Sequence, residues 1–266
     1  MAETAQSVSI SKVVGSGDGK AVFEDAAIGL NSGDPDDPPL SKSQVLEATA
    51  IRYCWAAADM ALDFCPVSSA RVVMPLEGTI EIAVADGWRR RLGLGDMIEY
   101  HHSSKGGVTT SVIGSQPFRA AVIDLGVDVL SAQLSQSDKG AVPDGVTYVR
   151  TVDGPDGKSR TLPGQLPYRH HGSWGWSTEP ISISAFQFVL APSNLDYSWH
   201  RAPQRQFVIP MTGGMEVENG LGERHKILPG EIYIGEDISG EGHITRAIDN
   251  QERLSIFAHL TEPFAA

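Results

Sequence analysis

Most of the chain consists of short apolar runs that are separated by glycine, aspartate and proline. Phe207, Ile209 and Met211 form one run with a period of two; Gly213 ends it, and a second alternating run follows. Similar segments follow one another between about residues 45 and 125. A period of two is typical of β-strands, and glycine between two such runs indicates a turn. The pattern therefore predicts an all-β fold.

The order of strands and turns occurs twice. Gly78 and Gly213 stand 135 positions apart, and each follows one apolar run and precedes another. The same separation relates five further pairs without a gap: Pro75 and Pro210, Glu81 and Glu216, Gly87 and Gly222, Arg89 and Arg224, Gly95 and Gly230. An internal repeat of this length predicts two copies of one β-barrel in a single chain.

The repeat and the local composition divide the chain into four parts. Residues 1–40 are expected to be an N-terminal segment and loop, and 41–130 a first barrel. Residues 131–167 are polar and rich in Gly and Pro, which predicts a linker, with room for a short hairpin. Residues 168–266 form the second predicted barrel.

Composition and net charge exclude some classes of binding partner. The 266 residues carry a net charge of −12, which argues against nucleic acid, because phosphate binding needs patches of Lys and Arg. The N-terminus lacks the pattern of a signal peptide, and no apolar run approaches the roughly 20 residues of a membrane helix. Two cysteines make no disulfide framework. We therefore expect a cytoplasmic protein with a small-molecule substrate and no membrane partner.

One stretch of the second half carries the candidate chemistry. His200 precedes an apolar run, Gln206 begins it, and Gly213 ends it; His243 follows the turn at Pro229-Gly230. This spacing resembles the two cupin motifs, with Gln206 at the usual Glu position and Ala202 at the position of the second His. The resemblance covers both halves. It implies a bicupin, a chain of two double-stranded β-helix (jelly-roll) barrels.

The first copy lacks these ligands. At the constant separation, His200, Ala202 and Gln206 correspond to Cys65, Val67 and Arg71, and His243 corresponds to Val108 or Gly107. We therefore expect the first barrel to be degenerate and structural.

The resemblance implies a divalent metal on His200, Gln206 and His243, and ligand type does not choose between Zn²⁺, Ni²⁺, Fe²⁺ and Mn²⁺. Three neutral ligands leave the full charge on the metal, which favours polarising a carbonyl or stabilising an enolate. The expected function is isomerase, cyclase or lyase chemistry on a small oxygenated molecule, through a metal-bound enolate. An Fe²⁺-dependent dioxygenase is one alternative. A barrel that binds a small molecule without metal is the other.

Further residues near the motif are candidates for the site. Glu236 and Asp237 are expected either to act as general acid or base or to cap backbone groups and pair with arginine. Four aromatic residues are expected to form pocket walls: Tyr197, Trp199, Trp174 and Trp176. For Trp174 and Trp176, packing within a surface or inter-barrel loop is an open alternative. The roles of the neighbouring His170 and His171 stay open, as does the choice between monomer and homodimer.

Overall fold

The computed structural model describes residues 6–32, 39–65, 69–101, 107–126 and 143–265. Within these ranges the regular structure is β-strand apart from one 3₁₀ turn, η2 (Gly172–Trp174). None of their helical segments is long and apolar enough to cross a membrane. The prediction of an all-β fold is confirmed.

The strands of the first half are β1 (Gln6–Gly15), β2 (Ala21–Ser32), β3 (Ser41–Lys42), β4 (Leu46–Glu47), β5 (Ala50–Ala56), β6 (Ala61–Leu62), β7 (Ala70–Glu77), β8 (Thr79–Ala83), β9 (Arg89–Leu92), β10 (Ile98–His101), β11 (Thr109–Ile113) and β12 (Phe118–Asp124).

The strands of the second half are β13 (Val146–Asp153), β14 (Ser159–Leu166), β15 (Arg169–His170), β16 (Trp176–Ser177), β17 (Ile181–Ala191), β18 (Asp196–His200), β19 (Gln206–Pro210), β20 (Met215–Glu218), β21 (Arg224–Ile227), β22 (Tyr233–Glu236), β23 (His243–Ala247) and β24 (Arg253–Leu260).

The two halves repeat one strand-pairing scheme. A small sheet in the order β6-β11-β8-β9 in the first half matches the order β18-β23-β20-β21 in the second. The registers match as well, because Ile80 faces Leu92 and Met215 faces Ile227, which are the same pairs 135 positions on. A larger sheet lies opposite each small one, in the orders β1-β10-β7-β12-β5 and β13-β22-β19-β24-β17. The predicted duplication of a two-sheet barrel is confirmed.

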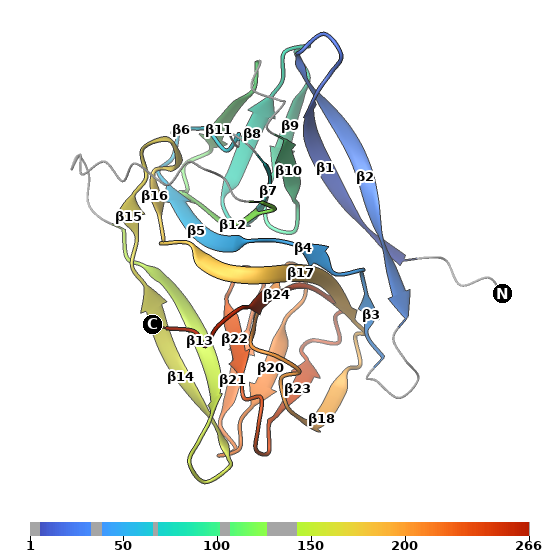
Figure 1. The fold of residues 1–266 in the computed structure, drawn as a ribbon, viewed down its shortest axis with the longest axis vertical. Coiled ribbons are helices and arrows are strands. Elements are labelled where there is room, and N and C mark those ends of the chain that lie inside the picture. Colours follow the sequence, from blue (N-terminus) through green and yellow to red (C-terminus); the bar gives the residue numbers. More distant parts are fainter. Residues whose placement is uncertain (1–5, 33–38, 66–68, 102–106, 127–142, 266) are drawn as a thin grey trace, which may run out of the picture.

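The large sheets of the two barrels pack on each other through apolar faces. Along β17, Phe186 and Phe188 belong to a core that also contains Ile51 and Met74 of the first half. The alternate residue Val189 belongs instead to a cluster inside the second barrel. Successive side chains of a strand point to opposite faces, and both faces of β17 are therefore buried. Figure 1 shows β5 and β17 side by side in the middle of the molecule, between the two barrels.

Each barrel is extended by a long hairpin. β1 and β2 form one, and β1 pairs in parallel with β10; β13 and β14 form the other, and β13 pairs in parallel with β22. Strands therefore occupy parts of the stretches predicted as N-terminal segment (1–40) and linker (131–167). The boundaries at residues 40, 130 and 167 stay a prediction.

The halves also exchange short edge strands (Figure 1). β3 of the first half pairs with β17 of the second, and Ser41 faces Leu190. β16 of the second half pairs with β5 of the first, and Trp176 faces Trp55. The two pairings are related by the same separation of 135 positions. Each barrel is thus completed by a piece of the other half.

Candidate functional site

A cavity of about 250 Å³ opens inside the second barrel. Its wall combines residues of the large sheet, the small sheet and the exchanged strand β3. The lining residues are Leu40, Lys42, Gln187, Leu195, Tyr197, His200, Arg201, Ala202, Pro203, Gln204, Gln206, Val208, Met215, Tyr233, Gly235, His243, Thr245, Arg253 and Phe257. The volume lies below the roughly 300–1,000 Å³ of pockets for drug-sized ligands, so the cavity suits a smaller molecule.

Two histidines that are far apart in sequence meet at the cavity wall. His200 ends β18 and His243 begins β23, and the two face each other in the antiparallel pair. Their ring centroids are 4.4 Å apart, with 56° between the ring planes. Tyr197 stacks on His200 at 3.8 Å between centroids, on the same small sheet. The small sheet therefore holds both imidazoles at one end of the cavity.

The Nδ1 atom of each histidine has a defined partner. His200 Nδ1 lies 2.7 Å from the Ser198 carbonyl oxygen, and His243 Nδ1 lies 2.6 Å from a carboxylate oxygen of Asp237. Because both partners are acceptors, Nδ1 carries the proton and Nε2 keeps the lone pair. Burial, reinforced by the neighbouring His243, lowers the pKa of His200 to about 4. His200 is therefore neutral near pH 7.

Of the two predicted acidic residues, only Asp237 contacts the histidine pair. Asp237 is fully buried behind His243. Burial raises the pKa of its carboxyl, while the hydrogen bond with His243 acts in the opposite direction. A carboxylate in this position orients an imidazole rather than touching a bound molecule.

Glu236 lies on the other face of β22, and its predicted acid–base role is corrected. Its carboxylate pairs with Arg150 and Arg205 and accepts a hydrogen bond from the Phe264 backbone N–H at 2.8 Å. Successive side chains of a strand point to opposite faces. Tyr233 and Gly235 of this strand line the cavity, so Glu236 points away from it. It ties the hairpin and the C-terminal segment to the barrel.

The third predicted metal ligand, Gln206, begins β19 and is buried in the cavity wall. Two imidazoles with free lone pairs on Nε2 suit a divalent cation, and the Gln206 amide oxygen is a neutral third donor. Among the described residues, no group of three His, Cys, Asp or Glu side chains is placed to hold a metal. The donor set therefore fits a metal held mainly by His200 and His243, without an anionic ligand.

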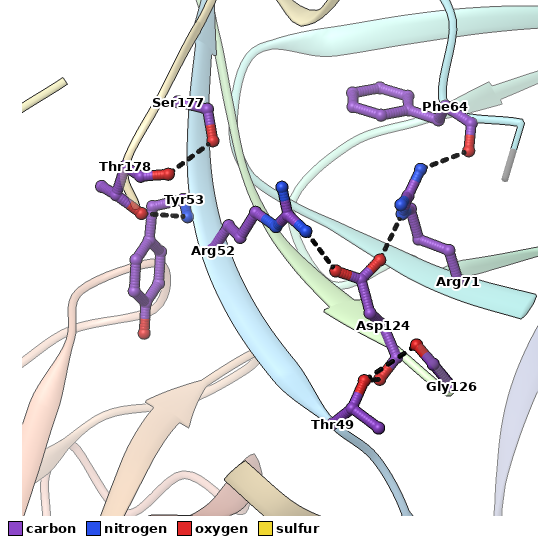
Figure 2. Close-up of polar contacts among 9 residues, drawn as sticks. All are labelled: Thr49, Arg52, Tyr53, Phe64, Arg71, Asp124, Gly126, Ser177 and Thr178. Atoms are coloured by element: carbon purple, nitrogen blue, oxygen red, sulfur yellow. Dashed lines mark hydrogen bonds and ion pairs between the residues drawn. The ribbon is translucent and has the colours of Figure 1, made fainter. Parts of the chain in front are cut away.

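The first barrel has a cluster of charged side chains, two of them at positions that border the cavity in the second. Arg71 and Arg52 stand at the positions of Gln206 and Gln187, and both bind the buried carboxylate of Asp124, at 2.7 and 3.0 Å (Figure 2). Apolar side chains, among them the fully buried Phe64, pack around this ion-pair cluster. Arg71 also donates to the Phe64 carbonyl oxygen.

The two barrels share one strand order and one register, and the second barrel has a His pair at the expected motif positions. These observations together decide the architecture. The chain has a bicupin fold. No family model and no curated protein matches the sequence of this bicupin.

Solved structures match the bicupin over most of its length. A cupin 2 conserved barrel domain protein from Leptotrichia buccalis is 9% identical, with 86% of this chain and 92% of that chain covered and a TM-score of 0.42. AerE from Microcystis aeruginosa is 16% identical, with 86% and 96% covered and a TM-score of 0.36. An oxalate decarboxylase from B. subtilis is 12% identical, with 88% and 76% covered and a TM-score of 0.33.

The four predicted pocket aromatics separate into two places. Tyr197 lines the cavity, and Trp199, 41% exposed, lines an open hollow beside it that shares His200. Trp174 and Trp176 lie elsewhere, and their assignment to this pocket is corrected. Trp174 is buried in the first barrel, where its indole N–H donates to the Asp63 carbonyl oxygen at 2.7 Å.

The reason for this difference is the strand exchange, because β16 carries the Trp-rich loop to β5 of the first barrel. His171 stacks on Trp174 with ring centroids 4.4 Å apart, and His170 packs edge-on against Trp176. Neither histidine lines the cavity of the second barrel. The aromatic loop therefore belongs to the packing of the first barrel.

The sequence analysis missed the basic residues of the cavity. Arg253 begins β24, and Lys42 comes from the exchanged strand β3 of the first half. A signal for Arg253 exists in the repeat, because the position 135 residues earlier is the fully buried Phe118. An arginine at a core position of the repeated barrel is unusual enough to indicate a function. No comparable signal marks Lys42, whose strand is two residues long.

Proposed function

We propose that the second barrel is the active site of an enzyme that acts on a small oxygenated molecule without net oxidation, by isomerisation, cyclisation or elimination. In this proposal His200 and His243 hold a divalent metal, with Gln206 beside them. The observation that carries it is the meeting of two imidazoles at the wall of one cavity, each with its Nδ1 bound to a fixed acceptor. Such fixed rings present their Nε2 lone pairs in one orientation.

The chain's own residues have separate tasks in this proposal. Asp237 and the Ser198 carbonyl fix the two tautomers, and the stacked Tyr197 fixes the plane of the His200 ring. Val208, Met215 and Phe257 form an apolar part of the cavity wall that limits water near the histidines. A divalent metal, when bound, supplies a positive charge that polarises a carbonyl oxygen of the substrate.

The donor set favours this chemistry over the dioxygenase alternative. Oxygen-activating Fe²⁺ sites of the facial-triad type combine two His with one carboxylate. Gln206 is neutral, and none of the described residues around the cavity is Asp or Glu. Oxygen consumption during turnover of a substrate would indicate a dioxygenase, because isomerisation and elimination consume no oxygen.

The same donor set also favours, as a second candidate, a barrel that binds its ligand without metal. Two histidines and one amide make a weak metal site, and Ala202 stands at the position of the second His of the first motif. In that case the Nε2 atoms of the His pair accept hydrogen bonds from the ligand, because both Nδ1 atoms are already bound within the protein.

The test is elemental analysis of protein produced with Zn²⁺, Ni²⁺, Fe²⁺ and Mn²⁺ supplied, for the wild type and for His200→Ala and His243→Ala. We expect about one metal per chain in the wild type and loss in both variants. Asp237→Asn should weaken metal binding about 10–100-fold, because it removes the carboxylate that orients His243. Glu236→Gln is the matched control and should keep the metal, because Glu236 points away from the cavity. Wild-type protein that binds none of the four metals would refute the metalloenzyme.

A further inference from the structure

The cavity of the second barrel is basic although the protein is acidic. The chain has 33 Asp and Glu against 21 Lys and Arg. Around the cavity this balance is reversed, because Lys42, Arg201 and Arg253 are present and none of the described lining residues is acidic. A cleft lined by charges of one sign concentrates ligands of the opposite sign. The charge of the cavity therefore favours an anionic ligand.

Arg253 is the buried part of this charge. Its side chain is 4% exposed, and its Nε and Nη1 atoms have no hydrogen-bond partner among the described residues. It faces Ala191 across the β24–β17 pair, and Ala191 belongs to the apolar cluster inside the barrel. Directly opposed residues of a strand pair lie on the same face. Arg253 thus points into the barrel, where it is one of the residues around the cavity.

Burial lowers the pKa of Arg253 to about 10, so its guanidinium stays charged at neutral pH. A buried charge without a counter-ion is unfavourable, and native proteins normally pair such a group. The first barrel shows this rule within the same chain, because its buried Arg52 and Arg71 share Asp124. At the position of Arg253 the first barrel has Phe118, which needs no counter-ion. Among the described residues of the second barrel, none supplies a carboxylate for this buried cation.

We propose that Arg253 binds a carboxylate group of the substrate, so that the second barrel accepts small carboxylic acids whose reacting atoms lie at His200 and His243. The position of the reacting atoms at His200 and His243 rests on the proposed function, whereas the binding of a carboxylate by Arg253 does not. The guanidinium has a planar fork of N–H donors that matches a carboxylate with two parallel hydrogen bonds. Lys42 lies beside Val189 on the same face of the sheet and also lines the cavity.

A carboxylate fits better than a phosphate. Phosphate sites commonly use the N-terminus of a helix or a glycine-rich loop with several converging backbone N–H groups. The wall around Arg253 is built from strands β17 and β24, whose backbone groups are paired with each other. The volume of about 250 Å³ further limits the ligand to a small acid.

The experiment uses chelator-treated full-length protein and isothermal titration with glycolate, malonate and succinate, each beside the corresponding amide. We expect at least one acid to bind about 10–100-fold more tightly than its amide, the range for a hydrogen bond to a charged group. Arg253→Met should abolish this preference. Arg91→Met is the matched control, because Arg91 is an exposed residue of the first barrel paired with Glu81, and it should keep the wild-type preference.

Thermal unfolding shows whether Arg253→Met is folded, and we expect a midpoint at or above that of the wild type, because the substitution removes an unpaired buried charge. Should this variant fail to fold, Arg253→Lys takes its place, with the preference reduced because the fork is lost. Equal binding of acids and amides, or an unchanged preference in the Arg253 variant, would overturn the proposal. So would tighter binding of inorganic phosphate or sulfate than of every acid.

The two proposals fail separately in this design. If the wild type binds no metal and turns over no substrate but still prefers acids through Arg253, the proposed enzyme is refuted and the carboxylate site stands. If metal binds at the His pair and acids are not preferred, the carboxylate site is refuted and the metal centre stands.

Discussion

Three equivalent positions show how single residues separate the two barrels. The first barrel has Arg52, Arg71 and Asp124, which neutralise one another in a buried cluster (Figure 2). The second has Gln187, Gln206 and His259 at these positions, and both Gln residues border the cavity. Neutral side chains at these positions need no internal counter-ion. The same backbone positions therefore make a packed interior in one barrel and a lined cavity in the other.

His171 predicts a dependence of stability on pH. Burial, with Arg52 nearby, lowers the pKa of His171 from 6.5 to about 4. Between pH 6.5 and 4 the unfolded chain binds a proton at His171 that the folded chain does not. The free energy of unfolding is therefore not reduced by this residue above pH 6.5, and it falls as the pH drops towards 4. We expect His171→Phe, which keeps an aromatic ring against Trp174, to reduce this slope.

Urea unfolding of the wild type and His171→Phe at several pH values measures the effect. Part of the slope should remain in the variant, because burial also lowers the pKa values of His200 and His259. Equal slopes in the two proteins would contradict the assignment to His171.

At the level of elements, short exchanged strands connect the two barrels. β16 is two residues long, and it is positioned on β5 through a tight approach at Gly175. This glycine has φ of 74°, and a Cβ atom there would lie 2.7 Å from the Trp55 carbonyl oxygen. Both the backbone conformation and the space therefore require glycine.

We expect Gly175→Ala to lower the free energy of unfolding by about 1–3 kcal/mol, the cost of a strained backbone residue. Gly172→Ala is the matched control in the same loop. Its φ is also positive, at 59°, but no atom lies within 4 Å of the added Cβ, so its cost should be smaller. Denaturant titration of both variants measures the difference, and equal costs would argue against the close packing of β16 on β5.

The sequence predicts the strands that carry the repeat well, and the long hairpins and the exchanged strands poorly. Strands β7, β8, β19 and β20 have clear alternation and Gly turns, and the constant separation reveals the duplication. The His pair follows from motif spacing. A two-residue strand such as β3 carries too few positions for a period, and its partner lies in the other half. For this reason the sequence placed Trp174 in the wrong barrel and did not predict the contribution of Lys42 to the cavity.

At the scale of the whole molecule, the two barrels depend on each other. Their large sheets share one apolar core, in which residues of both halves are fully buried. Burial of apolar surface contributes roughly 25 cal/mol per Å², so separating the halves would expose a large unfavourable surface. The edges of β5 and β17 would lose their exchanged partners as well. The molecule is therefore expected to unfold as a unit.

Dividing the chain tests this dependence. Residues 1–130 and 131–266, expressed separately, should each fail to give a cooperative unfolding transition. Co-expressed, they should form a one-to-one complex that unfolds in a single transition, as the intact chain does. A separate half with a cooperative transition of its own would show that the barrels fold independently.

The exchange of edge strands also has a consequence for how this molecule evolves. In a symmetric homodimer that swaps identical elements, one substitution alters both sites at once. Fusion of the two copies removes that constraint. Lys42 faces Val189 in the second barrel, while Ser177 occupies the equivalent place beside Cys54 in the first. A half without a His pair of its own can thus be selected for what it contributes to its neighbour, and the specificity of one barrel can change through mutations in the other.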